Sequence, residues 1–129
     1  MGIAIPDDVA EAIDSPVFAH IATVDEDGTP QVSVIWLERD GDRIRFSTAE
    51  GRAKPRNLRR DPRCTISFLP VDNPYRNIVL RGRAVSMDNA GSAMIDRLAN
   101  KYLGVDQYEW SVPGEVRVDV TVEVDRISG

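Results

Sequence analysis

One run of residues near the C-terminus constrains the fold more than any other feature of the sequence. From Glu115 to Asp125, every second residue is a valine and the residues between the valines are polar or charged. Successive side chains of a β-strand point to opposite faces of its sheet, so this alternation predicts a strand with one buried face and one wet face. The chain must therefore build a sheet whose core lies on the valine side.

Five other segments are typical of strands, and the connections between several of them are short. Asp25–Gly28 is a turn signal between two apolar segments, and Asp40–Gly41 is a tight-turn dipeptide. The predicted strands are residues 17–24, 29–38, 43–48, 63–69, 77–87 and 115–125. A doubly wound parallel sheet needs a helix between most strands, so this order favours an antiparallel barrel of six strands.

Three short helices are predicted beside these strands. Residues 6–14 begin with proline and acids, and Pro55 is suited to the first position of a helix over residues 55–60. A third helix is expected after a cap at Asp88 or Asn89. Its apolar stripe is Met94, Ile95, Leu98, Tyr102 and Ala99. At 129 residues the chain is predicted to form a single mainly β domain, residues 1–129.

Several classes of protein are disfavoured by composition. No apolar run reaches the roughly 20 residues that span a bilayer, and the N-terminus does not resemble a secretion signal, so we expect a cytoplasmic protein without a membrane partner. Cys64 is the single cysteine and is predicted to be a core residue. His20 is the single histidine, which argues against a multi-histidine metal site; a packed or interface role is favoured over a catalytic one.

Positive charge is concentrated in one segment of an acidic chain. The net charge is −5, but residues 52–63 carry +5 and the remainder −10. The basic residues of the segment are Arg52, Lys54, Arg56, Arg59, Arg60 and Arg63, against Asp61. A local cluster of this kind indicates a bound small anion rather than nucleic acid, which needs positive charge spread over a face. The alternative is that Arg56, Arg59, Arg60 and Arg63 only solvate an exposed helix.

The residues before the second predicted helix have the chemistry of a phosphate site. The free N–H groups of the first turn would point at a ligand before the helix, and Arg52 and Lys54 flank that position. The hydroxyls of Ser47 and Thr48, at the end of the preceding strand, add further hydrogen bonds. Glycine-rich loops of the ATP- or dinucleotide-binding type are absent from the sequence.

The motifs in this order resemble the pyridoxamine 5′-phosphate oxidase-like superfamily. More closely, the chain is similar to the actinobacterial branch of F420-dependent oxidoreductases. The segments that carry the resemblance are Ala19–Asp25, Gly28–Trp36, Phe46–Thr48, Gly51–Lys54, Asn57–Arg63, Asn73–Arg76, Arg81–Ala84 and Lys101–Gly104. The resemblance implies a six-stranded antiparallel split β-barrel that forms a homodimer, with cofactor sites at the interface.

The resemblance also implies roles for individual residues. Arg52 and Lys54 would hold the cofactor phosphate, and the strand-end hydroxyls of Ser47 and Thr48 would lie at its ribityl end. Residues expected near the charged tail are Asn57, Arg59 and Arg60; those along the ring are Pro30, Gln31, Val32 and Ser33; those donated by the other subunit are Tyr75 and Trp110.

The expected activity is hydride transfer from reduced F420 to a conjugated or quinone-like small-molecule acceptor. A deazaflavin supplies this chemistry itself, so we assign no catalytic side chain and no metal ligand. The phosphate grip of Arg52 and Lys54 suits FMN equally, and the surplus of Arg56, Arg59 and Arg60 favours the longer acidic tail of F420. The alternatives are an FMN-dependent oxidoreductase of the same fold and a non-catalytic module that binds cofactor or haem.

Overall fold

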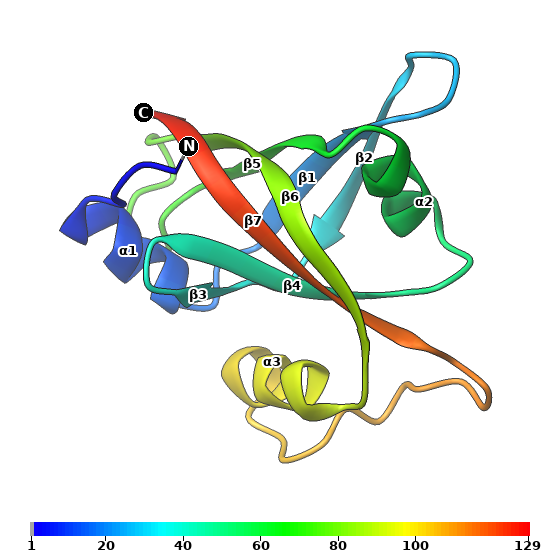
Figure 1. The fold of residues 1–129 in the computed structure, drawn as a ribbon. Coiled ribbons are helices and arrows are strands. Elements are labelled where there is room, and N and C mark those ends of the chain that lie inside the picture. Colours follow the sequence, from blue (N-terminus) through cyan, green and yellow to red (C-terminus); the bar gives the residue numbers. More distant parts are fainter. Residues whose placement is uncertain (1) are drawn as a thin grey trace.

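One antiparallel sheet runs through residues 2–129, the part of the chain that the computed structural model describes (Figure 1). Its seven strands are β1 (Ala19–Val24), β2 (Pro30–Ile35), β3 (Glu38–Asp40), β4 (Arg43–Ala49), β5 (Arg63–Phe68), β6 (Ile78–Ala90) and β7 (Arg117–Ser128). The helices are α1 (Asp7–Asp14), α2 (Ala53–Arg60) and α3 (Ala93–Leu103). The strand order is β2-β1-β5-β6-β7-β4-β3. The mainly β, antiparallel architecture predicted from the sequence is confirmed.

The predicted number of six strands is wrong, because residues 29–38 do not form one strand. β2 ends at Ile35, and the chain crosses through Trp36 and Leu37 before β3 begins on the opposite edge of the sheet. At the crossing, Leu37 is bonded by α3 instead of by a strand: its N–H donates to Tyr102 Oη at 3.2 Å and its carbonyl accepts from Lys101 Nζ at 2.6 Å. These bonds satisfy the Leu37 backbone outside the sheet.

The sheet curls but its hydrogen-bonded ladder does not close. Its two edge strands, β2 and β3, are consecutive in the chain, and within residues 2–129 they do not pair with each other. The expected split β-barrel is therefore an open, strongly curled sheet, and its ladder of hydrogen bonds is not closed. Figure 1 shows α1 near β3 at one end of the sheet and α2 near β2 at the other, with both chain termini at the α1 end.

The core lies on the valine face of β7, as predicted. Val118, Val120, Val122 and Val124 are buried together with large side chains such as Phe46 of β4. The opposite face is less exposed to solvent than the alternation predicts, since Arg117 is only 7% exposed and Thr121 is also buried.

The polar face of β7 is covered because α3 packs on that side of the sheet. Met94, Ile95 and Leu98 form a second small apolar cluster, against which Trp36, Tyr102 and Tyr108 pack. This confirms the predicted apolar stripe. The helix begins at Ala93 rather than at a cap on Asp88 or Asn89, because those two residues extend β6 and pair with Asp119 and Val118 of β7.

The second helix begins two residues earlier than predicted. α2 starts at Ala53, with Arg52 in the N-cap position, so Pro55 is the third helical residue. Proline is tolerated there because the N–H groups of a first turn have no intrahelical partner. Lys54 therefore belongs to the first turn itself and its position is fixed by the helix.

Cys64 is buried, as expected, and burial followed by the charge of Asp125 raises the pKa of its thiol to about 12. His20 points outward from β1 and is exposed. Its expected place in a protein interface stays a prediction. Within residues 2–129, no group of three or more His, Cys, Asp or Glu side chains is arranged to hold a metal ion.

Candidate functional site

An open cleft of about 180 Å³ lies between the end of β4, the first turn of α2, α3 and the segment between α3 and β7. One wall is polar and the other is apolar. The lining residues are Val34, Ile35, Trp36, Ser47, Thr48, Arg52, Lys54, Ile95, Leu98, Tyr108, Trp110 and Arg117. The structure thus brings together Ser47, Thr48, Arg52, Lys54 and Trp110, five of the residues that the sequence singled out.

Lys54 reaches across the cleft from α2 to β2. Its Nζ donates a hydrogen bond to Ser33 Oγ at 2.7 Å, which also fixes Ser33 beside the cleft. Burial, and then the nearby charge of Arg52, lower the pKa of Lys54. Because the partner is a neutral hydroxyl, this contact leaves the ammonium charge uncompensated, and an anion in the cleft would be attracted to it.

Arg117, the first residue of β7, forms the base of the polar wall. Its Nε donates to Ser47 Oγ at 3.1 Å, and its guanidinium lies 5.5 Å from the centre of the Tyr108 ring. Glu115 Oε1 lies 3.3 Å from Arg117 Nη1 and 3.6 Å from Arg52 Nη2. A buried guanidinium and a more exposed one thus face the same space.

Two buried polar atoms that line this cleft have no hydrogen-bond partner within residues 2–129. They are Thr48 Oγ1 and Arg117 Nη1; Glu115 Oε2, beside them, is a third. Buried polar groups are nearly always bonded, so unpaired donors indicate that a water or a ligand completes the site. Hydroxyl, guanidinium and ammonium donors fit a phosphate group.

The apolar wall is a chain of aromatic rings. Trp36 stacks on Tyr102 with ring centres 5.3 Å apart, and Tyr108 meets the edge or face of both Trp36 and Trp110, at 6.1 and 5.8 Å. Trp110 is 61% exposed at the outer end. Such a wall can cover one side of a planar ring system and exclude water from it.

Three residues expected near a charged tail make other contacts in this chain. Asn57 Nδ2 donates to Thr23 Oγ1 at 3.1 Å and to Asp25 Oδ1 at 2.9 Å. Arg60 donates to the Val24 carbonyl at 2.6 Å, and Arg59 forms a bidentate pair with Glu50 at 2.7 and 3.0 Å. None of the three lines the cleft described in residues 2–129. Their proposed contacts with a cofactor tail stay predictions.

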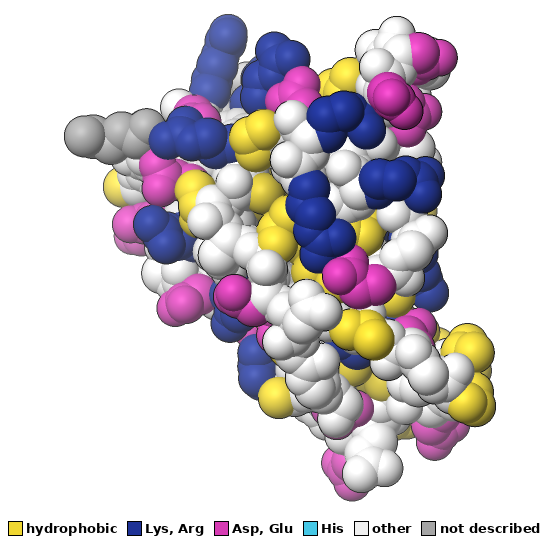
Figure 2. All heavy atoms as spheres, turned by 45° about the vertical axis from the view of Figure 1, so that its right-hand side comes forward, with side chains coloured by type: hydrophobic (Ala, Val, Ile, Leu, Met, Phe, Trp, Pro, Cys, Tyr) yellow, Lys and Arg dark blue, Asp and Glu magenta, His cyan; other side chains and the backbone are white. Residues whose placement is uncertain are grey.

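The basic side chains of α2 nevertheless gather on one face. Figure 2 shows Lys and Arg side chains over the upper part of the face that carries α2. A shallow groove there is lined by Arg52, Arg56, Arg59 and Arg60. Arg63 lies beyond it, paired with Asp61 at 2.7 Å. Much of the positive charge of residues 52–63 is therefore already met by neighbouring acids.

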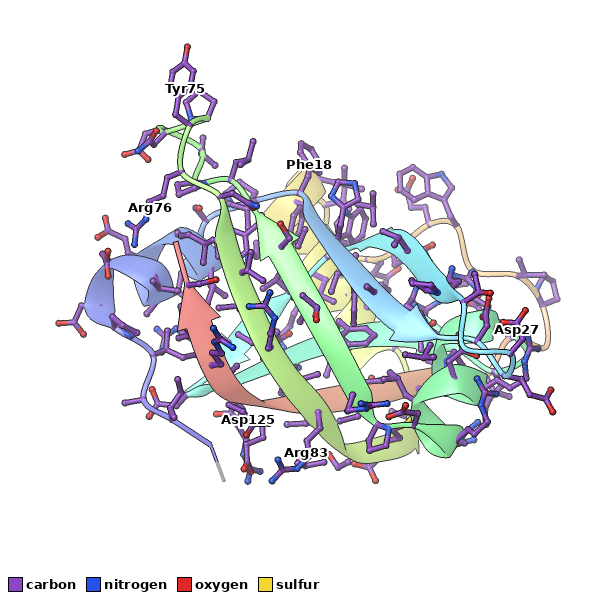
Figure 3. All side chains as sticks on the ribbon, turned by 90° about the horizontal axis from the view of Figure 1, so that it is seen from above. Phe18, Asp27, Tyr75, Arg76, Arg83 and Asp125 are labelled. Atoms are coloured by element: carbon purple, nitrogen blue, oxygen red, sulfur yellow. The ribbon has the colours of Figure 1, made fainter. Side chains whose placement is uncertain are left out.

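The remaining expected residues lie outside the cleft. Pro30 and Val32 face outward from β2, and Gln31 Oε1 accepts a hydrogen bond from Thr23 Oγ1 at 3.3 Å. Tyr75 is 96% exposed, and Figure 3 shows it projecting from its loop, far from the turn that carries Asp27 near α2. A contact from Tyr75 to a cofactor requires a second subunit, as the sequence resemblance implies.

The sequence did not single out Arg117 as a residue of the site. The available signal for Arg117 was its register: it pairs with Ala49 of β4, directly beside the predicted strand-end hydroxyls.

A larger hollow of about 600 Å³ lies between α1 and residues 70–76, but its arginine, Arg76, is already bonded to Asp8 and to the Gly129 carbonyl (Figure 3). In residues 2–129 the helices are too short or too polar to cross a membrane.

Comparison with known proteins identifies relatives over almost the whole chain. A sequence profile of the family described as pyridoxamine 5′-phosphate oxidase matches residues 5–125. A solved structure described as an F420 reductase is similar, with 31% identity and a TM-score of 0.84, over 96% of this chain and 98% of that one. A conserved hypothetical protein of Mycobacterium tuberculosis has 22% identity and a TM-score of 0.75, over 98% of this chain and 84% of that one; it shows a shared fold.

Proposed function

The chain belongs to the pyridoxamine 5′-phosphate oxidase family, and from this premise we propose that it is an oxidoreductase that binds reduced F420 and passes its hydride to a conjugated or quinone-like acceptor. The observation that carries the proposal is the cleft itself: the Lys54 ammonium, bonded to a neutral hydroxyl, lies with Thr48 Oγ1 and Arg117 Nη1, which make no hydrogen bond within residues 2–129, opposite an aromatic wall. The similarity to a protein described as an F420 reductase supports the choice of cofactor.

The residues of the cleft fit a phosphate group and a planar ring, and different residues would contact each of the two. Lys54, Arg52 and Arg117 would hold the phosphate, with the Ser47 and Thr48 hydroxyls completing its hydrogen bonds. Tyr108 and Trp110 would cover the ring and keep water out. When bound, the deazaflavin supplies the hydride chemistry. The chain's own contribution is binding, orientation and exclusion of water, so a general acid or base is not required.

A second copy of the chain is part of this proposal. The cleft of one protomer, about 180 Å³, is smaller than the roughly 300 Å³ at which ligand pockets begin. Close to it, Phe18, Val32, Val34 and Trp110 expose large apolar surfaces. A homodimer that covers this face would both bury these side chains and complete the cleft. Sedimentation equilibrium checks this, with a monomer at micromolar concentration as the contrary result.

The cofactor is tested by parallel titration with F420 and FMN, read as quenching of their fluorescence. We expect binding of F420 by the colourless protein. A yellow protein that releases FMN on denaturation favours the FMN-dependent alternative, since the phosphate grip suits both. Binding of neither cofactor contradicts the proposal.

Lys54→Ala tests the site within the same titration. The loss of one charge-assisted bond, about 1.5–3 kcal/mol, should weaken cofactor binding by roughly tenfold to a hundredfold. Arg63→Ala is the matched control: it removes one positive charge from the same segment, but Arg63 is exposed and paired with Asp61 outside the cleft. Equal losses in the two variants would mean that net charge, rather than the cleft, attracts the ligand.

A further inference from the structure

Glu115 lies in the segment that leads from α3 into β7, beside two arginines that line the cleft. Its carboxylate stands between two guanidinium groups, 3.3 Å from Arg117 Nη1 and 3.6 Å from Arg52 Nη2. The side chain is only 10% exposed, yet its second oxygen has no hydrogen-bond partner within the described residues. A carboxylate in this position occupies the place that an incoming anion would take.

The contacts of Glu115, at 3.3 and 3.6 Å, are longer than those of the shortest ion pairs of the protein. Arg59 and Glu50 meet at 2.7 and 3.0 Å in a bidentate arrangement. Arg117 Nη1, in contrast, is within ion-pair distance of Glu115 but makes no hydrogen bond in residues 2–129. Strong charge-assisted bonds are about 2.7–2.9 Å long. A phosphate, with more acceptor oxygens, can therefore satisfy Arg117 better than Glu115 does.

The backbone around Glu115 is held on both sides. Glu115 N–H donates to the Val112 carbonyl at 3.0 Å, and the Val116 carbonyl accepts from Glu50 N–H at 2.9 Å. Gly114 supplies the left-handed turn just before it, with φ of +81°. A displacement of the Glu115 carboxylate therefore needs rotation of the side chain alone.

We infer that Glu115 is an internal counter-ion of Arg52 and Arg117, which the phosphate of the ligand replaces. This inference rests on the proposed function for the identity of the ligand. In the free protein, Glu115 offsets one of the three positive charges of Arg52, Lys54 and Arg117 and keeps the buried Arg117 paired. The carboxylate lowers the affinity of the cleft for anions and leaves the affinity for uncharged ligands unchanged. Arg117 becomes a phosphate-binding residue once Glu115 has moved.

The test is Glu115→Gln, which keeps the shape of the side chain and removes its charge. The probes are riboflavin and whichever of F420 and FMN the wild-type protein binds. We expect the phosphorylated cofactor to bind more tightly to the variant, on the order of tenfold, which equals about 1.4 kcal/mol. Riboflavin, which has no phosphate, should bind equally to both proteins. Glu38→Gln is the matched control: it removes the same charge from an arginine pair of the same length, Glu38–Arg97 at 3.3 Å, outside the cleft, and should leave both affinities unchanged.

Unchanged or weaker binding of the phosphorylated cofactor to Glu115→Gln overturns the inference, because Glu115 would then orient Arg117 for the ligand instead of occupying its place. A wild-type protein that binds neither cofactor refutes the proposed function instead. The inference is then decided with inorganic pyrophosphate, whose protection against thermal unfolding should be larger for Glu115→Gln than for the wild type. If the variant does not fold, a wild-type crystal structure with bound cofactor decides: Glu115 must have left Arg117, and a retained contact overturns the inference.

Discussion

Substitution of Asn57 distinguishes most clearly between a structural role and a ligand-binding role for the same residue. Its side chain is 2% exposed and joins α2 to the β1–β2 turn through Thr23 and Asp25, while its Oδ1 accepts a bond from Arg60 Nη2 at 3.0 Å. Asn57→Ala removes all three bonds. The bond to the Asp25 carboxylate contributes about 1.5–3 kcal/mol and the neutral bond to Thr23 about 0.5–1.5 kcal/mol, so we expect a loss of roughly 2–4 kcal/mol in the free energy of unfolding.

Urea unfolding of the free protein measures this loss. For a chain of this size, 3 kcal/mol corresponds to a fall of roughly 10 °C in the midpoint of thermal unfolding. Asn100→Ala is the control, since Asn100 is exposed on α3 and alanine is the better helix former. A loss below about 1 kcal/mol with an unchanged m-value, together with weaker cofactor binding, would refute the structural role and restore the ligand contact implied by the sequence resemblance.

Three further predictions concern buried polar groups. Thr48→Val removes a buried hydroxyl that has no partner in residues 2–129; thermal melts should show stability unchanged or higher by about 1 kcal/mol, while cofactor affinity falls severalfold. Burial raises the pKa of Cys64 to about 12, so a thiol-disulfide reagent should leave the native protein unmodified and react at once in denaturant. Burial lowers the pKa of Lys101 from 10.5 to about 8, so above pH 8 the unfolded chain binds more protons than the folded one and stability should rise with pH. The rise ends near pH 10, where the raised pKa of Tyr102 acts in the opposite sense. Melts of Lys101→Met at several pH values should show a smaller rise, because the lowered pKa of Lys54 acts in the same sense as that of Lys101.

The sequence predicted best those elements whose periodicity is local. The valines of β7 and the stripe of α3 are confirmed because burial on one face repeats at the period of the element itself. The break between β2 and β3 was missed because nothing in the local pattern of residues 29–38 marks it. It depends on bonds from Lys101 and Tyr102 to Leu37, more than sixty positions apart in the chain.

The residues of the candidate site show the same contrast between what a local pattern predicts and what depends on distant contacts. Lys54 and Arg52 were predicted because a strand end, a charge cluster and a helix start follow one another within a few residues. Arg117 was missed because a charged residue on the outer face of an alternating strand indicates exposure to water. Arg117 is buried because α3 covers this face of β7 and Tyr108 packs over the guanidinium, and no pattern within residues 115–125 contains this information.

The break between β2 and β3 and the aromatic wall of the cleft both result from the crossing of the chain at Trp36 and Leu37. If β2 continued through Leu37, its carbonyl would belong to a strand ladder and Lys101 would lose one of its two acceptors, Leu37 and Ile13, both at 2.6 Å. α3 would then lose a main attachment to the sheet. The same crossing turns Trp36 out of the strand to stack on Tyr102, which places the tryptophan in the lining of the cleft. The end of β2 at Ile35 therefore has two consequences that a continuous strand would prevent. It lets Leu37 bond α3, the helix that covers the polar face of β7, and it places Trp36 in the aromatic wall beside Arg117.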